Sequence, residues 1–303
     1  MNIEDLRSVC ASVLSDISLK SLTTFKIGGL AKFVVYPQNF TEYKALLHMC
    51  KEKCVEYYIL GAGSNILADD GGFDGVIICT KKLNNISKNS PCRVRASCGV
   101  MLANLVRFCA DNGLTGLEWA INIPGTVGGA VVMNAGAFGG EMAKIVESVT
   151  ILNNGVPQVL ENSKLFFNYR HSVFTNKKNY AIMEVVFKLK KEAKEQIALN
   201  TRQFICKRTL TQNVGYPSAG SVFRRENDLI PAKLIEECGL KGERVGDAMV
   251  SPVHSGYIVN LGKATCGQVL ALIEKVKSRV HEKFNATMQC EIIHLKGKNC
   301  EKF

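Results

Sequence analysis

Two glycine-rich segments have the composition of loops that bind a phosphate group. "GAGSN" covers residues 61–65, and "IPGTVGGAVVMNAGA" covers residues 123–137. Glycines let backbone N–H groups approach an anion closely, and consecutive N–H groups can form an anion-binding nest. One such loop alone would indicate a tight turn, but the pair favours a dinucleotide held between two lobes.

The spacing of the glycines excludes two common nucleotide sites. The dinucleotide fingerprint G-x-G-x-x-G needs glycine at its sixth position, where this chain has Ile66, and "ILADDGGFDG" then breaks any helix. The second segment lacks the lysine and the spacing of a P-loop. The sequence therefore disfavours a Rossmann-type nicotinamide site.

Ser221 stands in the unusual segment "YPSAGSVFRR". Its neighbours read A-G-S-V-F and not the G-x-S-x-G turn of a nucleophilic serine, and nothing in the sequence pairs it with His171 or His254. From the residues alone, Ser221 is a turn or cap serine. Arg224 and Arg225 form either a solvated basic turn or contacts to a diphosphate, and both interpretations stay open.

Glu291 is a candidate site residue on the basis of its own surroundings. In "QCEIIHL", the alternation of a strand places it on the same face as Ile293 and Leu295. A carboxylate on an apolar face is costly unless it has a partner, which favours a site role over an edge position. Arg170 in "FNYRHSVF" would by default be a surface arginine with a buried stem.

The elements around these segments predict a mixed α and β protein. Apolar and alternating runs predict strands at 33–36, 56–60, 75–80, 92–97, 147–152, 181–189, 256–261 and 288–297. Helical patterns cover 41–53, 101–112, 191–210, 230–239 and 265–284. Thr265 is the expected N-cap of the last helix, and Gly239 ends the one before it.

The composition is that of a globular protein of the cytoplasm. Hydrophobic residues make up 47% of the 303 residues and charged residues 21%, without a signal peptide or a membrane-length apolar run. The 12 cysteines include no C-x-x-C pair, so we expect reduced thiols and no metal site. The net charge of +11 fits an anionic partner, but no stacking aromatics or zinc-finger pattern indicates nucleic acid.

The two glycine loops, in this order, resemble the MurB family, the UDP-N-acetylenolpyruvoylglucosamine reductases. Similar segments cover nearly the whole chain: "TTFKIGG", "LGAGSNIL", "IPGTVGGAVVMNAGAFG", "NYRHSVF", "YPSAGSVF", "HSGYIVN" and "CEIIHLKG". The resemblance implies an α+β protein with an FAD-binding fold of the p-cresol methylhydroxylase type. Its two α/β subdomains would cover residues 1–80 and 81–195, and a C-terminal α/β substrate domain would cover residues 196–303.

The resemblance further implies an FAD-dependent NADPH oxidoreductase of peptidoglycan synthesis, and so of cell-wall biogenesis, cell shape and cell division. NADPH would reduce noncovalently bound FAD, and hydride would then pass to the enolpyruvyl ether of a UDP-sugar, giving UDP-N-acetylmuramate. The two substrates would take turns, which predicts ping-pong kinetics. We expect no nucleic-acid or membrane partner and, with the oligomeric state otherwise open, a monomer.

The resemblance also implies roles for site residues. Ser221 would protonate the carbon next to the substrate carboxylate, while Arg170 and Glu291 stabilise the developing charge. Arg224, Arg225 and His254 would contact the substrate. The FAD-binding residues would be Gly61, Gly63, Ser64, Asn65, Pro124, Gly125, Thr126, Gly128, Gly129, Asn134, Ala135, Gly136 and Ala137.

The chain departs from the family pattern in two places. "RENDLI" follows the serine segment where members often have a proline, and Thr211-Gln212-Asn213 replaces Lys-Gln-Pro. The stretch between Arg170 and Ser221 is short, which indicates the variant without the substrate-loop tyrosine. Two alternatives remain open: another FAD-dependent oxidase or dehydrogenase of this fold, and a noncatalytic basic binding protein.

Overall fold

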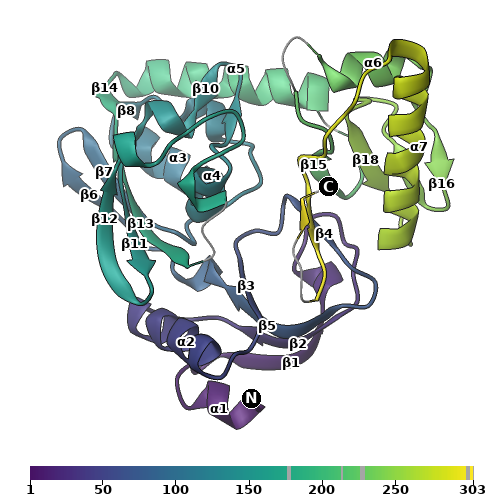
Figure 1. The fold of residues 1–303 in the computed structure, drawn as a ribbon. Helices are drawn as coiled ribbons and strands as arrows, with labels where there is room; N and C mark the ends of the chain where they lie inside the picture. The colour runs from purple at the N-terminus through teal and green to yellow at the C-terminus, as the bar shows by residue number, and fades with distance from the viewer. Residues whose placement is uncertain (176–178, 213, 226–228, 298–300, 303) are drawn as a thin grey trace. The chain divides into compact units, whose positions relative to one another are not determined.

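A computed structural model describes residues 1–175, 179–212, 214–225, 229–297 and 301–302. The chain divides into two compact units, each built from three separate stretches (Figure 1). Unit 1 contains Met1–Leu14, Val34–Ala62 and Ile77–Arg208, and unit 2 contains Ser15–Phe33, Gly63–Val76 and Thr209–Phe303. The first glycine loop is therefore shared between the units, and the three-domain division expected from the sequence stays a prediction.

A five-stranded antiparallel sheet organises unit 1. Its order is β12-β11-β13-β7-β6, with β6 Ile86–Ser90, β7 Arg93–Ser97, β11 Val146–Asn153, β12 Val156–Glu161 and β13 Tyr180–Lys188. Helix α4 (Val127–Val132) packs on β7 and β13, and α3 (Leu102–Asp111) lies nearby (Figure 1). Helix α3 buries one apolar stripe at helical spacing, formed by Leu102, Leu105, Val106 and Cys109.

Shorter elements complete unit 1. They are α1 (Ile3–Arg7), α2 (Phe40–Glu52), the pair β8 (Leu114–Thr115) and β14 (Lys190–Lys191), and the pair β9 (Gly136–Ala137) and β10 (Gly140–Glu141). A further sheet has the order β1-β2-β5-β3, with β1 Val13–Ser18, β2 Leu30–Val35, β3 Tyr57–Leu60 and β5 Phe73–Cys79. It does not belong to unit 1 alone, because β1, β2 and β5 each contain residues assigned to both units. Helix α5 (Lys194–Gln212) buries Ile197 and leads along the chain toward the last stretch of unit 2.

Unit 2 contains two small sheets. The first is antiparallel, in the order β15-β18-β17-β16, with β15 Ser218–Ser221, β16 Arg244–Val245, β17 Ala248–Val250 and β18 Tyr257–Asn260. The second has the order β20-β19-β4, with β4 Ile66–Ala68, β19 Ile293–Leu295 and β20 Glu301–Lys302, and β19 runs parallel to β4. This parallel pair joins two segments that are more than two hundred residues apart in the sequence.

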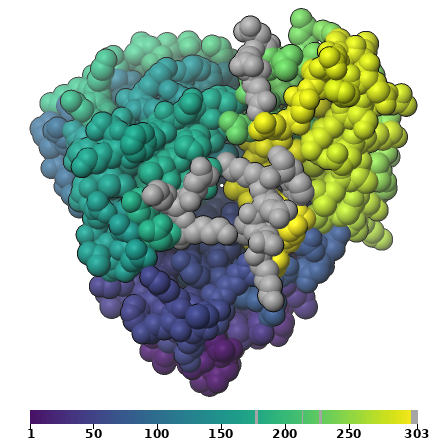
Figure 2. Space-filling view, viewed as in Figure 1, coloured from purple at the N-terminus to yellow at the C-terminus, as the bar shows by residue number. Residues whose placement is uncertain are grey.

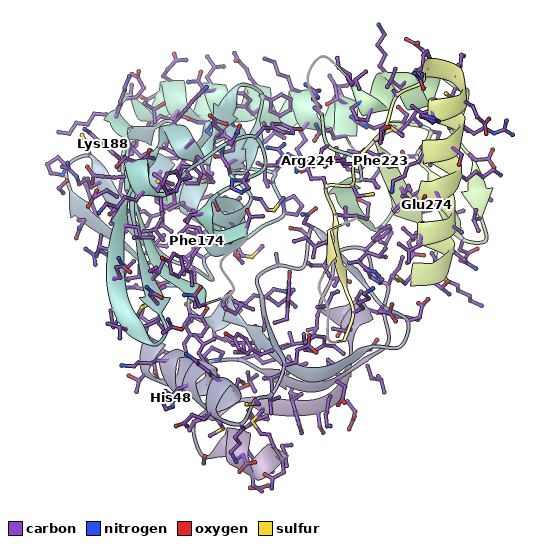
Figure 3. The ribbon with its side chains drawn as sticks, viewed as in Figure 1. His48, Phe174, Lys188, Phe223, Arg224 and Glu274 are labelled. Carbon is purple, nitrogen blue, oxygen red and sulfur yellow. The ribbon has the colours of Figure 1, made fainter. Side chains whose placement is uncertain are left out.

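Helices α6 (Pro231–Glu237) and α7 (Cys266–Phe284) complete unit 2. One hydrophobic cluster joins the inner face of α7 to residues from all three stretches of the unit, among them Phe25, Leu67, Val222 and Ile292. Helix α7 lies in the yellow-green part of the surface in Figure 2. Its outer surface carries charged side chains such as Glu274 (Figure 3), which pairs with Lys277. In the described part of the chain, no helix is long and apolar enough to cross a membrane.

The predicted elements agree with the structure where the periodicity is strong. The helices expected at 41–53 and 265–284 are α2 and α7, and Thr265 forms a reciprocal capping box with Gln268. The strand expected over 288–297 is shorter, because β19 begins only at Ile293. Helix α4 was not predicted, since glycines lower helix propensity; its N-terminus is capped by the side chain of Thr126.

The capping box of α7 generates a stability prediction. The substitution Thr265→Ala removes the side-chain acceptor of the Gln268 N–H, a bond of 3.2 Å. We expect the free energy of unfolding to fall by about 1 kcal/mol, measured by urea denaturation. Ser278→Ala, at an exposed position of the same helix, is the control and should change it by less than about 0.5 kcal/mol. Equal effects of the two substitutions would contradict the role of the cap.

Candidate active site

Three segments of unit 2 that the sequence singled out meet through backbone hydrogen bonds. The N–H of Glu291 donates to the carbonyl of Val222 at 2.7 Å, and the N–H of Ile293 donates to the carbonyl of Asn65 at 2.9 Å. The side-chain amide of Asn65 donates to the carbonyl of Glu291 at 3.2 Å. The end of the first glycine loop, the Ser221 segment and Glu291 therefore form one cluster, which we call the Asn65 junction.

Ser221 is the last residue of β15 and pairs with Tyr257 of β18. The preceding Gly220 has a φ of +79°, and a Cβ added there would meet no atom within 4 Å. Glycine is favoured at this position by the backbone conformation and not by crowding. The strand fixes the backbone of Ser221, and the residue itself is half-buried, so a ligand can reach it.

Glu291 lies just before β19, and its surroundings differ from those expected. The sequence pattern extends the strand back to Glu291, but the backbone there bonds to Val222 and Asn65 instead of a full strand ladder. Glu291 is half-buried, whereas Ile292 next to it is fully buried. Glu291 is thus not enclosed in the core, and its backbone belongs to the same cluster as the Ser221 segment.

The unit 2 part of the first glycine loop can bind an anion through its backbone. Gly63 is buried with a φ of +68°, and a Cβ there would lie 2.3 Å from the carbonyl oxygen of Leu22. Within the described ranges, no protein acceptor receives the N–H groups of Gly63, Ser64 or Asn65. Three successive N–H groups without a protein acceptor fit the pyrophosphate of a dinucleotide such as FAD.

In unit 1, the second glycine loop surrounds the start of α4. Thr126 is buried and accepts the N–H of Gly129 at 3.4 Å, and a Cβ on Gly61 would lie 2.3 Å from its hydroxyl oxygen. The N–H of Gly128 donates to Cys98 O at 2.8 Å, so Gly128 serves close packing. Along the rest of this stretch, Pro124 and Gly129 are exposed and Gly125 is half-buried.

Asn134 holds the loop around it in place. Its side-chain amide donates to Glu141 Oε2 at 3.2 Å and to Asn168 O at 3.0 Å, and its Oδ1 accepts the N–H of Ala143 at 2.9 Å. The residue is buried and has a φ of +40°. Because both ends of the amide bond to the protein, the structure gives Asn134 a holding role, while the half-buried Ala135, Gly136 and Ala137 follow it.

Arg170 lies beside this same loop of unit 1. Its Nη2 donates to the carbonyl of Gly136 at 3.1 Å, and its guanidinium lies 5.1 Å from the ring centre of Tyr169. Its φ is +50°, within a turn closed by two backbone bonds between Asn168 and His171. A non-glycine residue in this conformation carries strain, which is typical of functional positions. The structure thus brings together the predicted loop 134–137 and Arg170.

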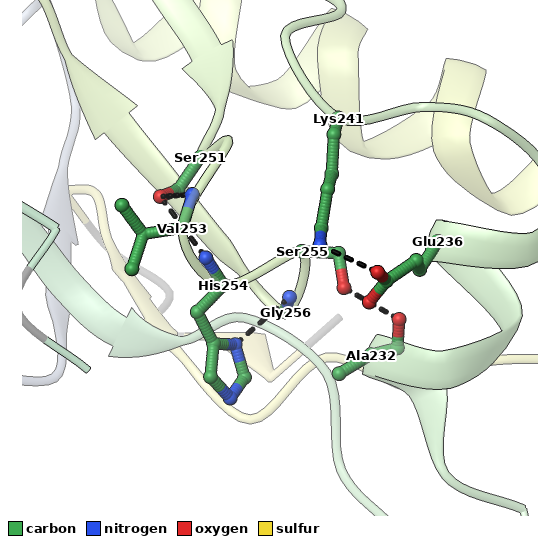
Figure 4. A network of polar contacts seen from close by, with 8 residues as sticks. All are labelled: Ala232, Glu236, Lys241, Ser251, Val253, His254, Ser255 and Gly256. Atoms are coloured by element: carbon green, nitrogen blue, oxygen red, sulfur yellow. Dashed lines mark hydrogen bonds and ion pairs between the residues drawn. The ribbon is translucent and has the colours of Figure 1, made fainter. Parts of the chain in front are cut away.

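The predicted substrate contacts lie in unit 2. Arg224 is half-buried beside the buried Phe223 (Figure 3), and its N–H donates to Gln289 O at 2.9 Å, whereas Arg225 is exposed. His254 lies in a turn, where its Nδ1 accepts the N–H of Gly256 at 3.1 Å (Figure 4). The departures from the family pattern at Asn213 and within 226–228 lie outside the described residues.

Two polar residues that sequence reasoning did not single out support these segments. Asn260 is buried and donates from its side chain to Phe25 O at 3.1 Å, while its Oδ1 accepts the N–H of Ala264 at 3.0 Å. The hydroxyl of Thr24 donates to Ser218 O at 2.7 Å, at the start of β15. Both are polar residues inside or beside apolar runs, and that is the signal that could have identified them.

The contacts of Asn134 predict a large effect of its removal. Asn134→Ala leaves two acceptors and one donor without this partner and puts alanine in a left-handed conformation. We expect a loss of about 2–4 kcal/mol in the free energy of unfolding, measured by urea denaturation. Asn179→Ala removes one exposed contact, to Asn153, and serves as the control. A loss no greater than that of the control would contradict the holding role.

The turn at His254 predicts a dependence of stability on pH. Burial, assisted by the charges of Lys241 and Arg225, lowers the pKa of His254 below its ordinary value. The neutral imidazole of His254 therefore contributes to the free energy of unfolding. This contribution is fully present above the pKa of the unfolded state, about 6.5, and is lost as the pH falls through the lower pKa of the folded state.

The substitution His254→Asn keeps an acceptor but removes this titration. We expect the free energy of unfolding of this variant to fall less steeply below pH ~6.5 than that of the wild-type protein. His281→Asn, at an exposed position of α7, is the matched control and should keep the wild-type slope. Identical slopes for wild type and His254→Asn would refute the interpretation.

Comparison with known proteins identifies the family. Residues 212–295 match the family described as UDP-N-acetylenolpyruvoylglucosamine reductase, C-terminal domain, and residues 31–156 match the family described as FAD binding domain. The UDP-N-acetylenolpyruvoylglucosamine reductase of Clostridium novyi is 41% identical over 281 residues, 92% of this chain and 91% of that protein. That of Clostridium kluyveri is 40% identical over 293 residues, 96% and 93% of the two chains.

A solved structure agrees with these matches. The crystal structure of UDP-N-acetylenolpyruvylglucosamine reductase (MurB) from Thermus caldophilus is similar with a TM-score of 0.80 and 33% identity, over 92% of this chain and 98% of that one. These matches confirm the predicted α+β fold with an FAD-binding domain and a MurB-type C-terminal domain. The chain belongs to the UDP-N-acetylenolpyruvoylglucosamine reductase family.

Proposed function

We propose that the protein is an FAD-dependent reductase that converts UDP-N-acetylglucosamine-enolpyruvate to UDP-N-acetylmuramate, with NADPH as the reductant. The relatives that share most of the chain are reductases named for this substrate class. The observation that carries the proposal is the Asn65 junction, which connects an anion-binding loop, a serine segment and a glutamate. Reduction of a nucleotide-linked enol ether needs such a set: a cofactor loop, a proton donor and a charged group.

The backbone of unit 2 fits the cofactor. The N–H groups of Gly63, Ser64 and Asn65 would hold the pyrophosphate of FAD, because they donate to no acceptor in the described part of the protein. Residues 31–156, which match the FAD-binding family, include the second glycine loop of unit 1. When bound, FAD supplies the hydride chemistry between NADPH and the enol ether.

Ser221 would supply the proton of the reduction. The reaction adds a hydride to the methylene carbon and a proton to the carbon next to the carboxylate. A serine is a weak acid, but the enolate-like species formed by hydride addition is a strong base, so the transfer is reasonable. The hydroxyl then regains its proton from solvent. We assign Glu291 to stabilising the charge that develops on the substrate. Its N–H donates to the carbonyl of Val222, directly after Ser221, which brings the two residues into one cluster.

Arg170 offers a different kind of group in unit 1. Its guanidinium is permanently charged and planar, and its fork of N–H donors suits a carboxylate. The bond to Gly136 and the stacking on Tyr169 limit the positions that this side chain takes. We assign Arg170 to the carboxylate of the enolpyruvyl group. Arg224, Arg225 and His254 remain candidate contacts to the UDP-sugar.

The proposed reaction also indicates the cellular location and the partners of the protein. Where the chain is described, its cysteines are free thiols, as expected in a reducing compartment, and we infer a cytoplasmic location. The product would enter peptidoglycan synthesis, and through it cell-wall biogenesis, cell shape and cell division. The UDP-sugar is the proposed partner, with no nucleic acid or membrane, and the protein is proposed to be a monomer.

The role of Ser221 predicts a split between the two half-reactions. Ser221→Ala should lower the oxidation of NADPH that depends on the UDP-enolpyruvyl sugar by roughly 10²–10⁴-fold, the usual contribution of general acid catalysis. Flavin reduction by NADPH alone should survive, because no proton from Ser221 is needed for it. Steady-state turnover and the bleaching of the flavin absorbance measure the two steps separately.

Ser218→Ala is the matched control, since Ser218 is half-buried in the same strand, β15. It should turn over close to the wild-type rate. Wild-type turnover in Ser221→Ala would remove the proton-donor assignment. A protein that takes up no FAD would instead favour the alternative of a noncatalytic basic protein.

A further inference from the structure

Three side chains with metal-binding atoms converge in unit 2, apart from the Asn65 junction. They are Asp69, Cys266 and His294, and their ligand atoms all lie within 4.8 Å of one another. Asp69 directly follows β4, His294 is the middle residue of β19, and Cys266 is the first residue of α7. The parallel pairing of β4 and β19 fixes two of these positions, since His294 is opposite Leu67.

The contacts meet at one ring nitrogen. Nε2 of His294 lies 3.3 Å from the Sγ of Cys266 and 3.0 Å from Oδ2 of Asp69. In either tautomer Nε2 presents one proton or one lone pair. It therefore cannot donate to the carboxylate and accept from the thiol at the same time. A cation between the three atoms would satisfy all of them together. We propose that Asp69, Cys266 and His294 form a zinc-binding site.

The chemistry of the three groups suits Zn²⁺. Zinc is bound in proteins by thiolate, imidazole and carboxylate, with bonds of about 2.0–2.3 Å. Around a tetrahedral zinc such bonds place the ligand atoms roughly 3.3–3.6 Å apart, close to the two distances observed. Calcium and magnesium prefer oxygen ligands, which makes a sulfur and nitrogen set unfavourable for them.

The burial of the three groups leaves one position for solvent. His294 and Cys266 are buried, while the side chain of Asp69 is 35% exposed. Water can therefore supply a fourth ligand on the side of Asp69. Cysteine binds zinc as the thiolate, so the thiol proton of Cys266 would pass to water as the sulfur–zinc bond forms.

Asp70 prepares the position of Cys266. Its two carboxylate oxygens accept the N–H groups of Cys266 and Gly267 at 2.8 and 3.0 Å, at the N-terminus of α7. This carboxylate offsets the positive end of the helix dipole, which would otherwise disfavour a cation there. The zinc would then join β4, β19 and α7, three elements from distant parts of the sequence, and act as a structural clip independent of the proposed catalysis.

Cobalt titration of the full-length protein, freed of metal with a chelator, tests the site. We expect one equivalent of Co²⁺ to give a thiolate-to-cobalt charge-transfer band that Zn²⁺ displaces. Zn²⁺ should also raise the melting temperature. Cys266→Ala should abolish the band, and Asp69→Asn should weaken affinity by roughly tenfold or more. Cys290→Ala is the control, since Cys290 is also a buried thiol of unit 2, and should leave the band unchanged.

Three results would overturn the proposal. One is a wild-type protein without the charge-transfer band and without a Zn²⁺-dependent rise in melting temperature. Another is a band that survives in Cys266→Ala. Should Cys266→Ala fail to fold, Asp69→Asn decides, because it keeps the size of the side chain. A folded Asp69→Asn protein, checked by circular dichroism, with wild-type metal affinity would also refute the site.

Discussion

The hydrogen bonds of Asn65 are the interaction on which the proposed chemistry of unit 2 depends. Its carbonyl accepts from Ile293 and its side-chain amide donates to Glu291, so one residue holds the C-terminal segment to the first glycine loop. The bond between Glu291 and Val222 extends this link to the Ser221 segment. Buried backbone groups must find partners, and here they find them between segments that carry chemistry.

Unit 1 uses a comparable arrangement around strained backbone. Asn134, Phe138 and Arg170 all have positive φ without being glycine, a conformation that persists only where surrounding contacts enforce it. The three hydrogen bonds of Asn134 and the bond from Arg170 to Gly136 provide that enforcement. The guanidinium of Arg170 is therefore fixed by the loop beside it. Asn134 also bonds to Asn168 O, at the start of the turn that contains Arg170.

Much of the architecture could be predicted from local patterns. The helix expected at 265–284 and its cap at Thr265 are confirmed, because amphipathic period and capping act within a few residues. The predicted extent of the last strand was wrong, because the backbone of Glu291 bonds to Val222 and Asn65 and the strand begins only at Ile293. No sequence pattern indicated the cluster of Asp69, Cys266 and His294. Its members are too far apart in the chain for any spacing motif.

The sequence by itself determined the family, the two glycine loops and the choice of Ser221, Glu291 and Arg170, because these are properties of residue type and local order. Only the tertiary structure decided which of them meet. Glu291 joins the Ser221 segment and Asn65 in unit 2, whereas Arg170 joins Gly136 in unit 1. Such contacts arise from strand pairing and side-chain hydrogen bonds between distant segments. No pattern within a short stretch encodes them, because the partners lie far apart in the sequence and make no contact until the chain folds.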